Sequence, residues 1–269
     1  MDLDLRKLRY FVEVAEHRHF GRAAEKLYIA QPVLSRQIRA FEQELDCTLL
    51  VRTTRSVELT AAGQQLYEEA KGILASVDAA VRRVHDVDQE VRRLVVAFAP
   101  GLHVSEAIRA FAAQYPDVEI DLVPARWWEQ DAPLRDGRAQ IAYLRRPFDE
   151  SGLRTILIGN EPRVACMPAT HPLAHRRDLT RADVEGERTL DAPTRRTTSL
   201  EEKFELIAAG HGIALIPLSV ARAYARPDLI HLPVTDAPPI ERCLAVAADR
   251  RESLLRDFLE IATSTLRSA

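Results

Sequence analysis

Basic and polar side chains gather in the first half of one predicted helix, where they could contact DNA. The stretch 20–45, FGRAAEKLYIAQPVLSRQIRAFEQEL, has apolar residues at helical spacing on both sides of a short break, which predicts two amphipathic helices joined by a tight turn. Between residues 31 and 40 the second helix carries Arg36 and Arg39 and no acid, and its acids lie at the far end. Such a helix can place its basic half in a major groove, with the acids held away from the phosphates. On spacing alone, a helical hairpin with a solvated polar face explains these residues equally well.

The segment that follows favours the DNA-binding interpretation. Residues 49–60, LLVRTTRSVELT, are β-prone and carry Arg52 and Arg55, with no acid before Glu58. They predict a two-stranded wing whose tip presents Arg55 to a minor groove or a phosphate. Turns rich in Thr and Arg are also common on surfaces, but the position directly after a basic helix favours the wing.

Two further helices would hold this motif in place. Leu5 to His17 predicts a first helix that packs across the pair and completes a three-helix unit. From Ala61 to Gln89, apolar residues recur at alternating spacings of four and three, the heptad pattern: Leu66, Ala70, Ile73, Val77, Ala80, Val84, Val87 and Val91. Such a stripe needs a partner, either its copy in a second subunit or the chain's own C-terminal domain. Two copies would fix the separation of two recognition helices, as a two-fold DNA site requires.

Beyond Arg93 the pattern changes to alternating strands and helices. Predicted strands cover 94–100, 118–124, 139–144, 163–168, 212–217 and 243–248, and predicted helices cover 105–115, a segment through Asp136, 200–209 and 253–266. Apolar strands alternating with helices predict a mostly parallel sheet covered on both faces. Ligands of such sheets bind beyond the carboxyl ends of the strands.

The composition sets the limits of this interpretation. The 269 residues suffice for two or three domains, and 46% hydrophobic with 29% charged residues predicts a soluble protein with a substantial core. The net charge of −3 argues against a generally basic nucleic-acid coat but not against one basic face. Cys47, Cys166 and Cys243 lie far apart in apolar contexts, which predicts buried structural thiols. Without a secretory signal or a run of about 18 apolar residues, we expect a cytoplasmic protein that does not span a membrane.

Over its whole length the chain resembles LysR-type transcriptional regulators. The residues that carry the resemblance are LRYFVEVAEHRHFGRAAEKLYIAQPVLSRQIRAFEQEL, LLVRTTRSVELTAAG, FAAQYPDVEI, LRDGRAQIAY, HPLA and AAGHGIALIP, in the family's order. The resemblance implies an α/β protein overall. Its parts would be an all-α winged helix-turn-helix domain at 1–60, a linker and dimerisation helix at 61–91, and a two-lobed effector domain at 92–269, similar to periplasmic binding proteins. Lobe I would cover about 92–160 and 236–269, and lobe II about 161–235.

The resemblance also implies partners. These are double-stranded DNA with a two-fold promoter site, a small-molecule effector, a second copy of the chain, a tetramer built as a dimer of dimers, and RNA polymerase. No cofactor or metal is expected.

The family's DNA contacts fall on residues with suitable chemistry. By position the groove contacts are Gln31, Pro32, Ser35 and Arg36, with Arg55 at the wing. Arg36 can bond a guanine edge with two hydrogen bonds, and Gln31 can bond adenine. Arg39 and Arg52 are expected to contact phosphate or to be structural.

The sequence departs from the family in two places. Ala30 stands where a serine usually caps the recognition helix, and losing such a cap costs about 1 kcal/mol. Between Leu190 and Leu200 the chain is too short for the helix and strand that the family usually has there, so the second lobe is predicted to be trimmed.

Position-matching places an effector cleft at 100–103, 126–128 and 144–146, opposite 193–198. The candidate ligand-binding residues are Pro100, Gly101, Leu102, Trp127, Arg146, Pro193, Thr194 and Thr198. Arg146 matches a position that holds an anionic effector in the family, and a helix starting near Thr198 would also favour an anion. We therefore expect a small acid, with an aromatic ring suited to Trp127 and Trp128. The alternative is that the arginines are merely solvated and one tryptophan belongs to the core.

A solute-binding module or an enzyme on the same α/β scaffold is the competing class of function. The sequence has no Gly-x-Ser-x-Gly elbow, no phosphate loop, no Cys–Cys metal spacing and no His-Glu-x-x-His motif, so no enzymatic activity is expected. The segment 191–198 contains no cysteine, which disfavours a thiol redox sensor.

Overall fold

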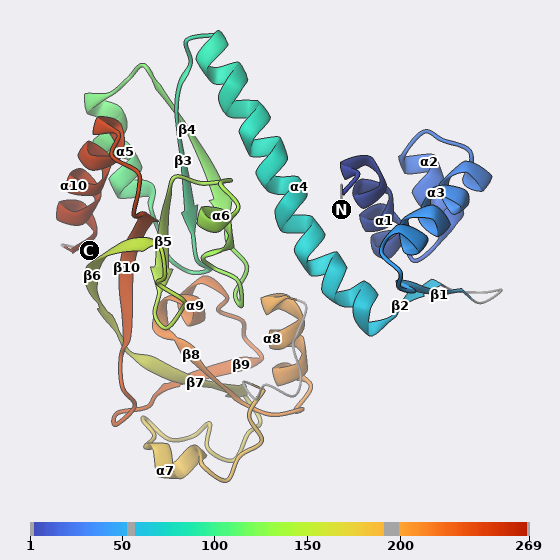
Figure 1. Cartoon of the computed structure of the whole chain (residues 1–269). Helices are drawn as coiled ribbons and strands as arrows, with labels where there is room; N and C mark the ends of the chain where they lie inside the picture. Colours follow the sequence, from blue (N-terminus) through green and yellow to red (C-terminus); the bar gives the residue numbers. More distant parts are fainter. Residues whose placement is uncertain (1–2, 53–56, 191–198, 268–269) are drawn as a thin grey trace. The chain divides into compact units, whose positions relative to one another are not determined.

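The chain divides into two compact units, Met1–His85 and Asp86–Ala269 (Figure 1). The computed structural model describes residues 3–52, 57–190 and 199–267. Each unit is described by itself below.

The first unit is built on the predicted three helices. They are α1 (Leu5–His17), α2 (Phe20–Lys26) and α3 (Gln31–Glu44). The apolar side chains predicted from helical spacing meet in one core, where Leu8, Phe11, Leu34 and Ile38 have no exposed surface. Removing these side chains from water is what holds the short helices in place, because helices of this length are marginal alone.

The helix ends show where side chains replace missing backbone partners. The Asp4 carboxylate accepts a hydrogen bond from the Arg6 N–H at the start of α1, at 2.8 Å. At the start of α2 the His19 Nδ1 accepts from the N–H groups of Gly21 and Arg22. No side chain caps α3 at Ala30, as the sequence predicted. Pro32 in the first turn has no N–H, and the Val33 N–H donates to the Ala30 carbonyl at 2.9 Å, so neither residue offers a free backbone donor.

The wing and the linker helix follow as predicted. Strand β1 (Leu50–Arg52) pairs antiparallel with β2 (Val57–Leu59), and α4 runs over Ala61–Asp88. Because α4 ends at Asp88, Val91 lies outside the helix and cannot continue the heptad seam. Arg55 and the side chain of Arg52 lie outside the described residues.

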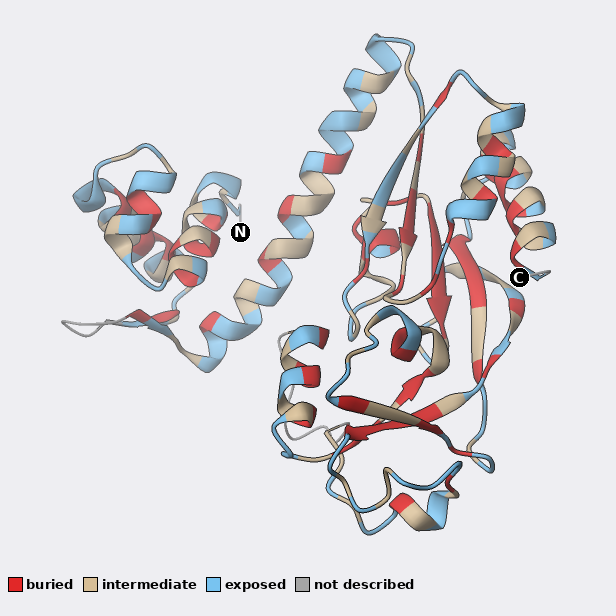
Figure 2. Ribbon diagram, turned by 180° about the vertical axis from the view of Figure 1, so that it is seen from behind, coloured by how far each residue is buried: buried red, intermediate tan, exposed pale blue. Residues whose placement is uncertain are grey.

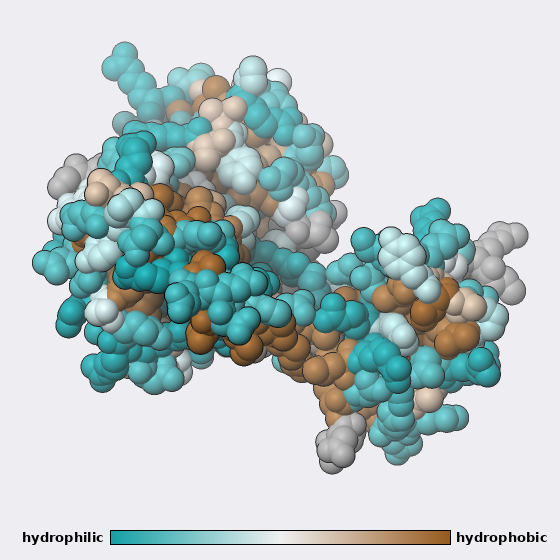
Figure 3. Space-filling view, turned by 90° about the horizontal axis from the view of Figure 1, so that it is seen from above, coloured by the Kyte–Doolittle hydropathy of each residue, from teal (hydrophilic) through white to brown (hydrophobic). Residues whose placement is uncertain are grey.

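The heptad stripe of α4 divides into two parts. Ala70 is buried in the core of the first unit and Leu66 packs against it, so this part of the stripe is covered within the chain. Farther along, Ile73, Val84 and Val87 expose 38%, 69% and 80% of their surface. In Figure 3 hydrophobic surface is visible along the segment that links the two units. The sequence predicted that the whole stripe faces a partner. That prediction is wrong for Leu66 and Ala70, which pack within the first unit.

A tight corner joins the wing to α4. The Thr60 hydroxyl accepts a hydrogen bond from the Gly63 N–H at 2.9 Å and donates to the Thr48 carbonyl at 2.7 Å. The Thr60 N–H donates to the Leu49 carbonyl at 3.0 Å. A Cβ on Gly63 would overlap that same Leu49 oxygen, so only glycine fits here.

The second unit contains two sheets. The larger has the strand order β4-β3-β5-β10-β6, and the smaller has the order β8-β7-β9. The strands are β3 (Arg92–Phe98), β4 (Val118–Pro124), β5 (Ile141–Arg145), β6 (Leu153–Glu161), β7 (Arg163–Pro168), β8 (Ala214–Pro217), β9 (Leu229–Pro233) and β10 (Ile240–Ala247). The helices are α5 (Ser105–Gln114), α6 (Ala132–Arg135), α7 (Arg181–Val184), α8 (Leu200–Ala208), α9 (Leu218–Ala223) and α10 (Ser253–Arg267).

The prediction of a mostly parallel sheet is wrong. Strand β3 is parallel to β4 and β5, but β10 is antiparallel to both of its neighbours. In the smaller sheet β7 is antiparallel to β8 and to β9. The prediction took continuous apolar runs as a sign of parallel strands. Strand β10 has such a run because it is central and covered on both faces, so burial and not direction determines its sequence.

Helices and core residues cover both faces of the larger sheet. Phe111 of α5 and Phe258 of α10 pack with Leu94 and Ile141 on one face, and Leu134 of α6 packs on the other. Figure 2 shows that much of the central strands is buried. Cys243 in β10 of the larger sheet and Cys166 in β7 of the smaller sheet are buried, as predicted, whereas Cys47 is only half-buried. Burial raises the pKa of Cys243 to about 11, so it stays a neutral thiol. In the described part of the chain, no helix is long and apolar enough to cross a membrane.

Two glycines of α4 predict opposite effects of the same substitution. Gly63→Ala is expected to destabilise the protein by about 1–3 kcal/mol, because the new Cβ forces the helix away from Leu49. Gly72→Ala meets no atom within 4 Å and is expected to stabilise it by about 0.5–1 kcal/mol. Urea denaturation followed by the helical signal measures both. A Gly63→Ala protein as stable as the unmodified chain would contradict the close packing of this corner.

Candidate nucleic-acid interface and ligand pocket

The exposed face of α3 carries most of the side chains that the sequence selected. Leu34, Ile38 and Phe41 turn inward, and the predicted contact residues Gln31, Pro32, Arg36 and Arg39 are exposed. Ser35 is half-buried. Val33, which the spacing placed in the apolar stripe, is instead 37% exposed. A methyl-bearing side chain there can contact a thymine methyl, so Val33 joins the candidate surface.

The acids at the far end of α3 are engaged with the protein itself. The Glu42 Oε1 accepts hydrogen bonds from the Leu49 N–H at 2.9 Å and the Leu50 N–H at 3.0 Å. Glu44 forms an ion pair with Lys7 of α1. The charge sorting seen in the sequence therefore has a structural cause. The acids hold α1 and the wing, and the basic half of α3 faces outward.

Glu42 is a positioning residue that the sequence reasoning missed. It was interpreted only as a negative charge kept away from phosphates. Its two hydrogen bonds satisfy buried N–H groups at the start of β1 and so fix the wing relative to α3. The contact spans seven and eight residues, which no helical or strand periodicity reveals.

Tyr28 is a second residue that the sequence did not point to. It lies in the turn between α2 and α3 with φ of 55° and is 95% exposed. The Ile29 N–H donates to the Ala24 carbonyl at 3.0 Å, so the left-handed residue closes α2 as a glycine usually does. The turn thus presents an aromatic ring and a hydroxyl directly before the recognition helix.

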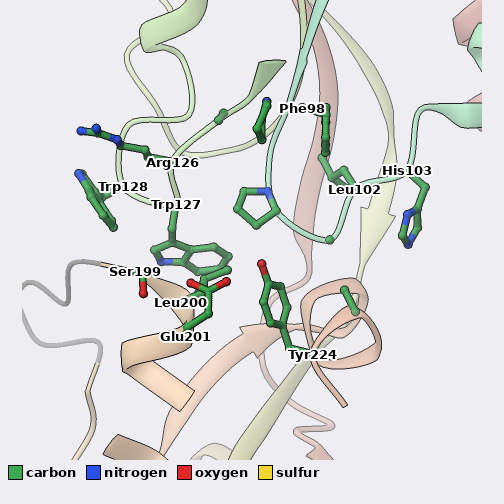
Figure 4. A pocket seen from close by; sticks show the side chains of 15 residues that line it. Phe98, Leu102, His103, Arg126, Trp127, Trp128, Ser199, Leu200, Glu201 and Tyr224 are labelled. Atoms are coloured by element: carbon green, nitrogen blue, oxygen red, sulfur yellow. The ribbon is translucent and has the colours of Figure 1, made fainter. Parts of the chain in front are cut away.

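The second unit contains a cavity of about 420 Å³ beyond the ends of β3 and β4. Its walls are the loops after these strands, the start of α8 and the end of α9 (Figure 4). The lining residues are Phe98, Pro100, Gly101, Leu102, His103, Pro124, Ala125, Arg126, Trp127, Trp128, Ser199, Leu200, Glu201, Ala223 and Tyr224. A cavity of this size with apolar walls and a few polar groups is typical of a small-molecule site.

Comparisons with known proteins decide the family. The model described as "Bacterial regulatory helix-turn-helix protein, lysR family" matches residues 5–64, and the model "LysR substrate binding domain" matches 88–196 and 190–267. The chain belongs to the LysR family of transcriptional regulators. It is a DNA-binding regulator with an effector-binding domain and not an enzyme. The two parts of the second match overlap at residues 190–196, within the segment where the sequence predicts a shortened second lobe.

Several relatives agree with this assignment. The Hca operon transcriptional activator HcaR of Escherichia coli (strain K12) is 30% identical over 294 residues, covering 99% of each chain. Because that alignment is longer than the 269 residues here, it must open gaps in this chain. The uncharacterized regulator YnfL of the same organism is 42% identical over 189 residues, 68% of this chain and 64% of YnfL. The crystal structure of CbnR, a LysR family transcriptional regulator, shares the fold with a TM-score of 0.63 at 21% identity, covering 98% of this chain and 99% of CbnR.

The structure brings together part of the effector cleft that was predicted for this LysR-family chain. Pro100, Gly101, Leu102 and Trp127 all line the cavity. Pro193, Thr194 and Thr198 lie outside the described residues.

The structure does not bring Arg146 into the pocket. Its guanidinium donates to Glu150 at 2.7 Å, to Glu241 at 2.6 Å and to the Thr155 hydroxyl at 3.0 Å. The hydrogen bonds that Arg146 donates to the Glu150 and Glu241 carboxylates raise the pKa of Arg146 above its usual value. Two carboxylates thus already neutralise this arginine, and it is not among the cavity's lining residues. The prediction that Arg146 holds an anionic effector is corrected on this geometry.

Its neighbour Arg145 is a buried structural link. Arg145 is 4% exposed and forms an ion pair with Glu161, and it donates to the Pro100 carbonyl at 2.8 Å and the Ser219 hydroxyl at 2.6 Å. The Ser219 hydroxyl in turn donates to Glu161 at 2.6 Å. Burial lowers the pKa of Arg145, and the charge of Glu161 opposes that shift. The network joins the ends of β5 and β6 to α9 and fixes the Pro100 wall of the cavity.

The role of Glu42 predicts a stability difference between two acids of α3. Glu42→Ala leaves two buried N–H groups unpaired and is expected to destabilise the protein by about 1–3 kcal/mol. Glu44→Ala removes a partly exposed ion pair and is expected to cost at most about 1 kcal/mol. Denaturant unfolding of both variants measures the difference. Equal stability of the two variants would contradict the positioning role of Glu42.

Proposed function

We propose that this LysR-family regulator binds a two-fold promoter site as a cytoplasmic homodimer, with the α3 helix of each copy in a major groove. The observation that carries the proposal is the exposed basic half of α3, presented by a fully buried three-helix core.

Within the groove, each exposed residue of α3 has a distinct task. Arg36 bonds a guanine edge, Gln31 bonds an adenine, and Val33 contacts a thymine methyl. Pro32 and Ser35 lie against the same edges or the nearby backbone. Arg39 contacts phosphate, and Arg52 and Arg55 are assigned to the wing contact on the strength of their position in the sequence.

The exposed part of the α4 stripe supports a homodimer. Ile73, Val84 and Val87 form apolar surface that a second copy of α4 would cover. By family resemblance two such dimers form a tetramer and act on RNA polymerase. An effector in the cavity between β3, β4, α8 and α9 would change how the dimer holds its DNA site.

The base-reading assignment is tested by Arg36 and Arg39. Arg36→Ala is expected to lower affinity for the specific site by about 1–3 kcal/mol and to relax base preference at one position, because a bidentate contact to one base is lost. Arg39→Ala is expected to weaken binding to all sequences evenly, since phosphate carries no sequence information. Gel-shift titrations with the promoter beside the protein's own gene and with unrelated DNA measure both. Unchanged specific binding by the Arg36→Ala protein would refute the assignment.

A charged substitution on the exposed apolar stripe of α4 tests the proposed dimer. Val84→Asp is expected to shift the protein toward monomer and to weaken binding to a two-fold site, because the dimer would have to bury an unpaired carboxylate. The control is Arg82→Asp, which adds an acid to the opposite face of the same helix turn. Sedimentation velocity measures the species present. A Val84→Asp protein with the unmodified chain's oligomeric state would overturn the α4 interface.

A further inference from the structure

Four aromatic side chains form part of the wall of the cavity in the second unit. Trp127, Trp128, Phe98 and Tyr224 come from three different segments and surround it (Figure 4). The faces of such rings carry negative electrostatic potential, so they attract cations as well as flat apolar groups. The Nζ of the buried Lys203 lies 5.6 Å from the Trp127 ring centroid, so this ring already makes one cation–π contact within the protein.

The acid of the described lining is Glu201, in the first turn of α8. Glu201 and Tyr224 both line the cavity, and in Figure 4 the Tyr224 hydroxyl points toward the side of the cavity where Trp127 and Glu201 are drawn. Burial raises the pKa of Tyr224, and the negative charge of Glu201 and a hydrogen bond to it raise this pKa further. Aromatic faces and a carboxylate therefore converge at one end of the cavity.

Among the described residues that line the cavity, the basic side chains are poorly placed to bind an anion. Arg126 has a side chain 52% exposed and lies 3.9 Å from the Glu129 carboxylate, which compensates its charge. His103 is exposed and lies across the cavity from Trp127 in Figure 4. Arg146, the expected anion-binding residue, is outside the cavity and holds two carboxylates.

The start of α8 does not offer an open anion site. The Ser199 hydroxyl accepts a hydrogen bond from the Glu202 N–H at 3.1 Å, which satisfies one of the free donors. Glu201 and Glu202 place two negative charges in the first turn, where they compensate the positive end of the helix dipole. An anionic ligand here would approach a carboxylate and not an uncompensated helix end.

We propose that the effector of this protein is an organic cation, with a flat apolar body against the aromatic walls and an ammonium group beside Glu201 and the Trp127 and Tyr224 rings. The proposal replaces the small acid expected from the sequence. It rests on the proposed function, since it takes this cavity to be the effector site.

Three probes of similar shape and different charge test the proposal on the full chain. They are 2-phenylethylammonium, neutral phenylacetamide and anionic phenylacetate, titrated by isothermal calorimetry. Probes of this size are expected to bind at about 1 mM. The ammonium probe is expected to bind at least about tenfold more tightly than the anionic probe, because Glu201 attracts one charge and repels the other.

Matched variants identify the group responsible. Glu201→Gln is expected to weaken binding of the ammonium probe by about tenfold and to leave binding of phenylacetamide unchanged. Glu202→Gln is the control, because it removes a charge from the same helix turn at a residue that does not line the cavity. Equal effects of the two variants would overturn the role of Glu201.

Two other outcomes would also overturn the ligand class: phenylacetate binding as tightly as the ammonium probe, or no binding by any of the three. Gel shifts with promoter DNA on the same preparations keep this result separate from the proposed function. A protein that binds its promoter and prefers the acid contradicts the cation proposal alone. A protein that does not bind promoter DNA contradicts the proposed function.

Discussion

The backbone around Leu49 is the point on which the DNA-binding unit depends. The N–H of Leu49 is held by Glu42 of the recognition helix, and its carbonyl accepts from Thr60 at the end of the wing. The same carbonyl sets the closest approach of Gly63 in the linker helix. Recognition helix, wing and linker helix therefore meet at the backbone of one residue, Leu49. Because each contact is short and buried, a change in the direction of α4 moves the wing with it.

The sequence predicted the local elements well and their connections less well. The helices α1 to α4 follow from apolar spacing, because each buries one stripe in a shared core. The direction of β10 could not be predicted, since a central strand covered on both faces is apolar in either direction. The contact between Glu42 and the wing was missed because hydrogen bonds to a turn leave no periodic pattern.

In the ligand pocket, too, the sequence predicted the apolar wall residues better than the positions of the charged side chains. The family resemblance predicted by position that Pro100, Gly101, Leu102 and Trp127 form an effector cleft, and all four line the cavity at the ends of neighbouring strands. Arg146 was misplaced because one of its partners, Glu241, lies 95 residues along the chain and only the fold brings the two together. Glu201 lies in the first turn of α8, where the sequence predicted a helix start that favours an anion, and Tyr224 follows α9, where no pattern marks a ligand site.

A footprint on the region beside the protein's own gene tests the central claim most directly. If two α3 helices occupy two-fold related grooves, cleavage protection is predicted at two symmetric half-sites separated by whole turns of about 10 base pairs. The protection should survive at a salt concentration that removes binding to unrelated DNA. Protection at a single half-site, or none beyond that of unrelated DNA, would contradict the account.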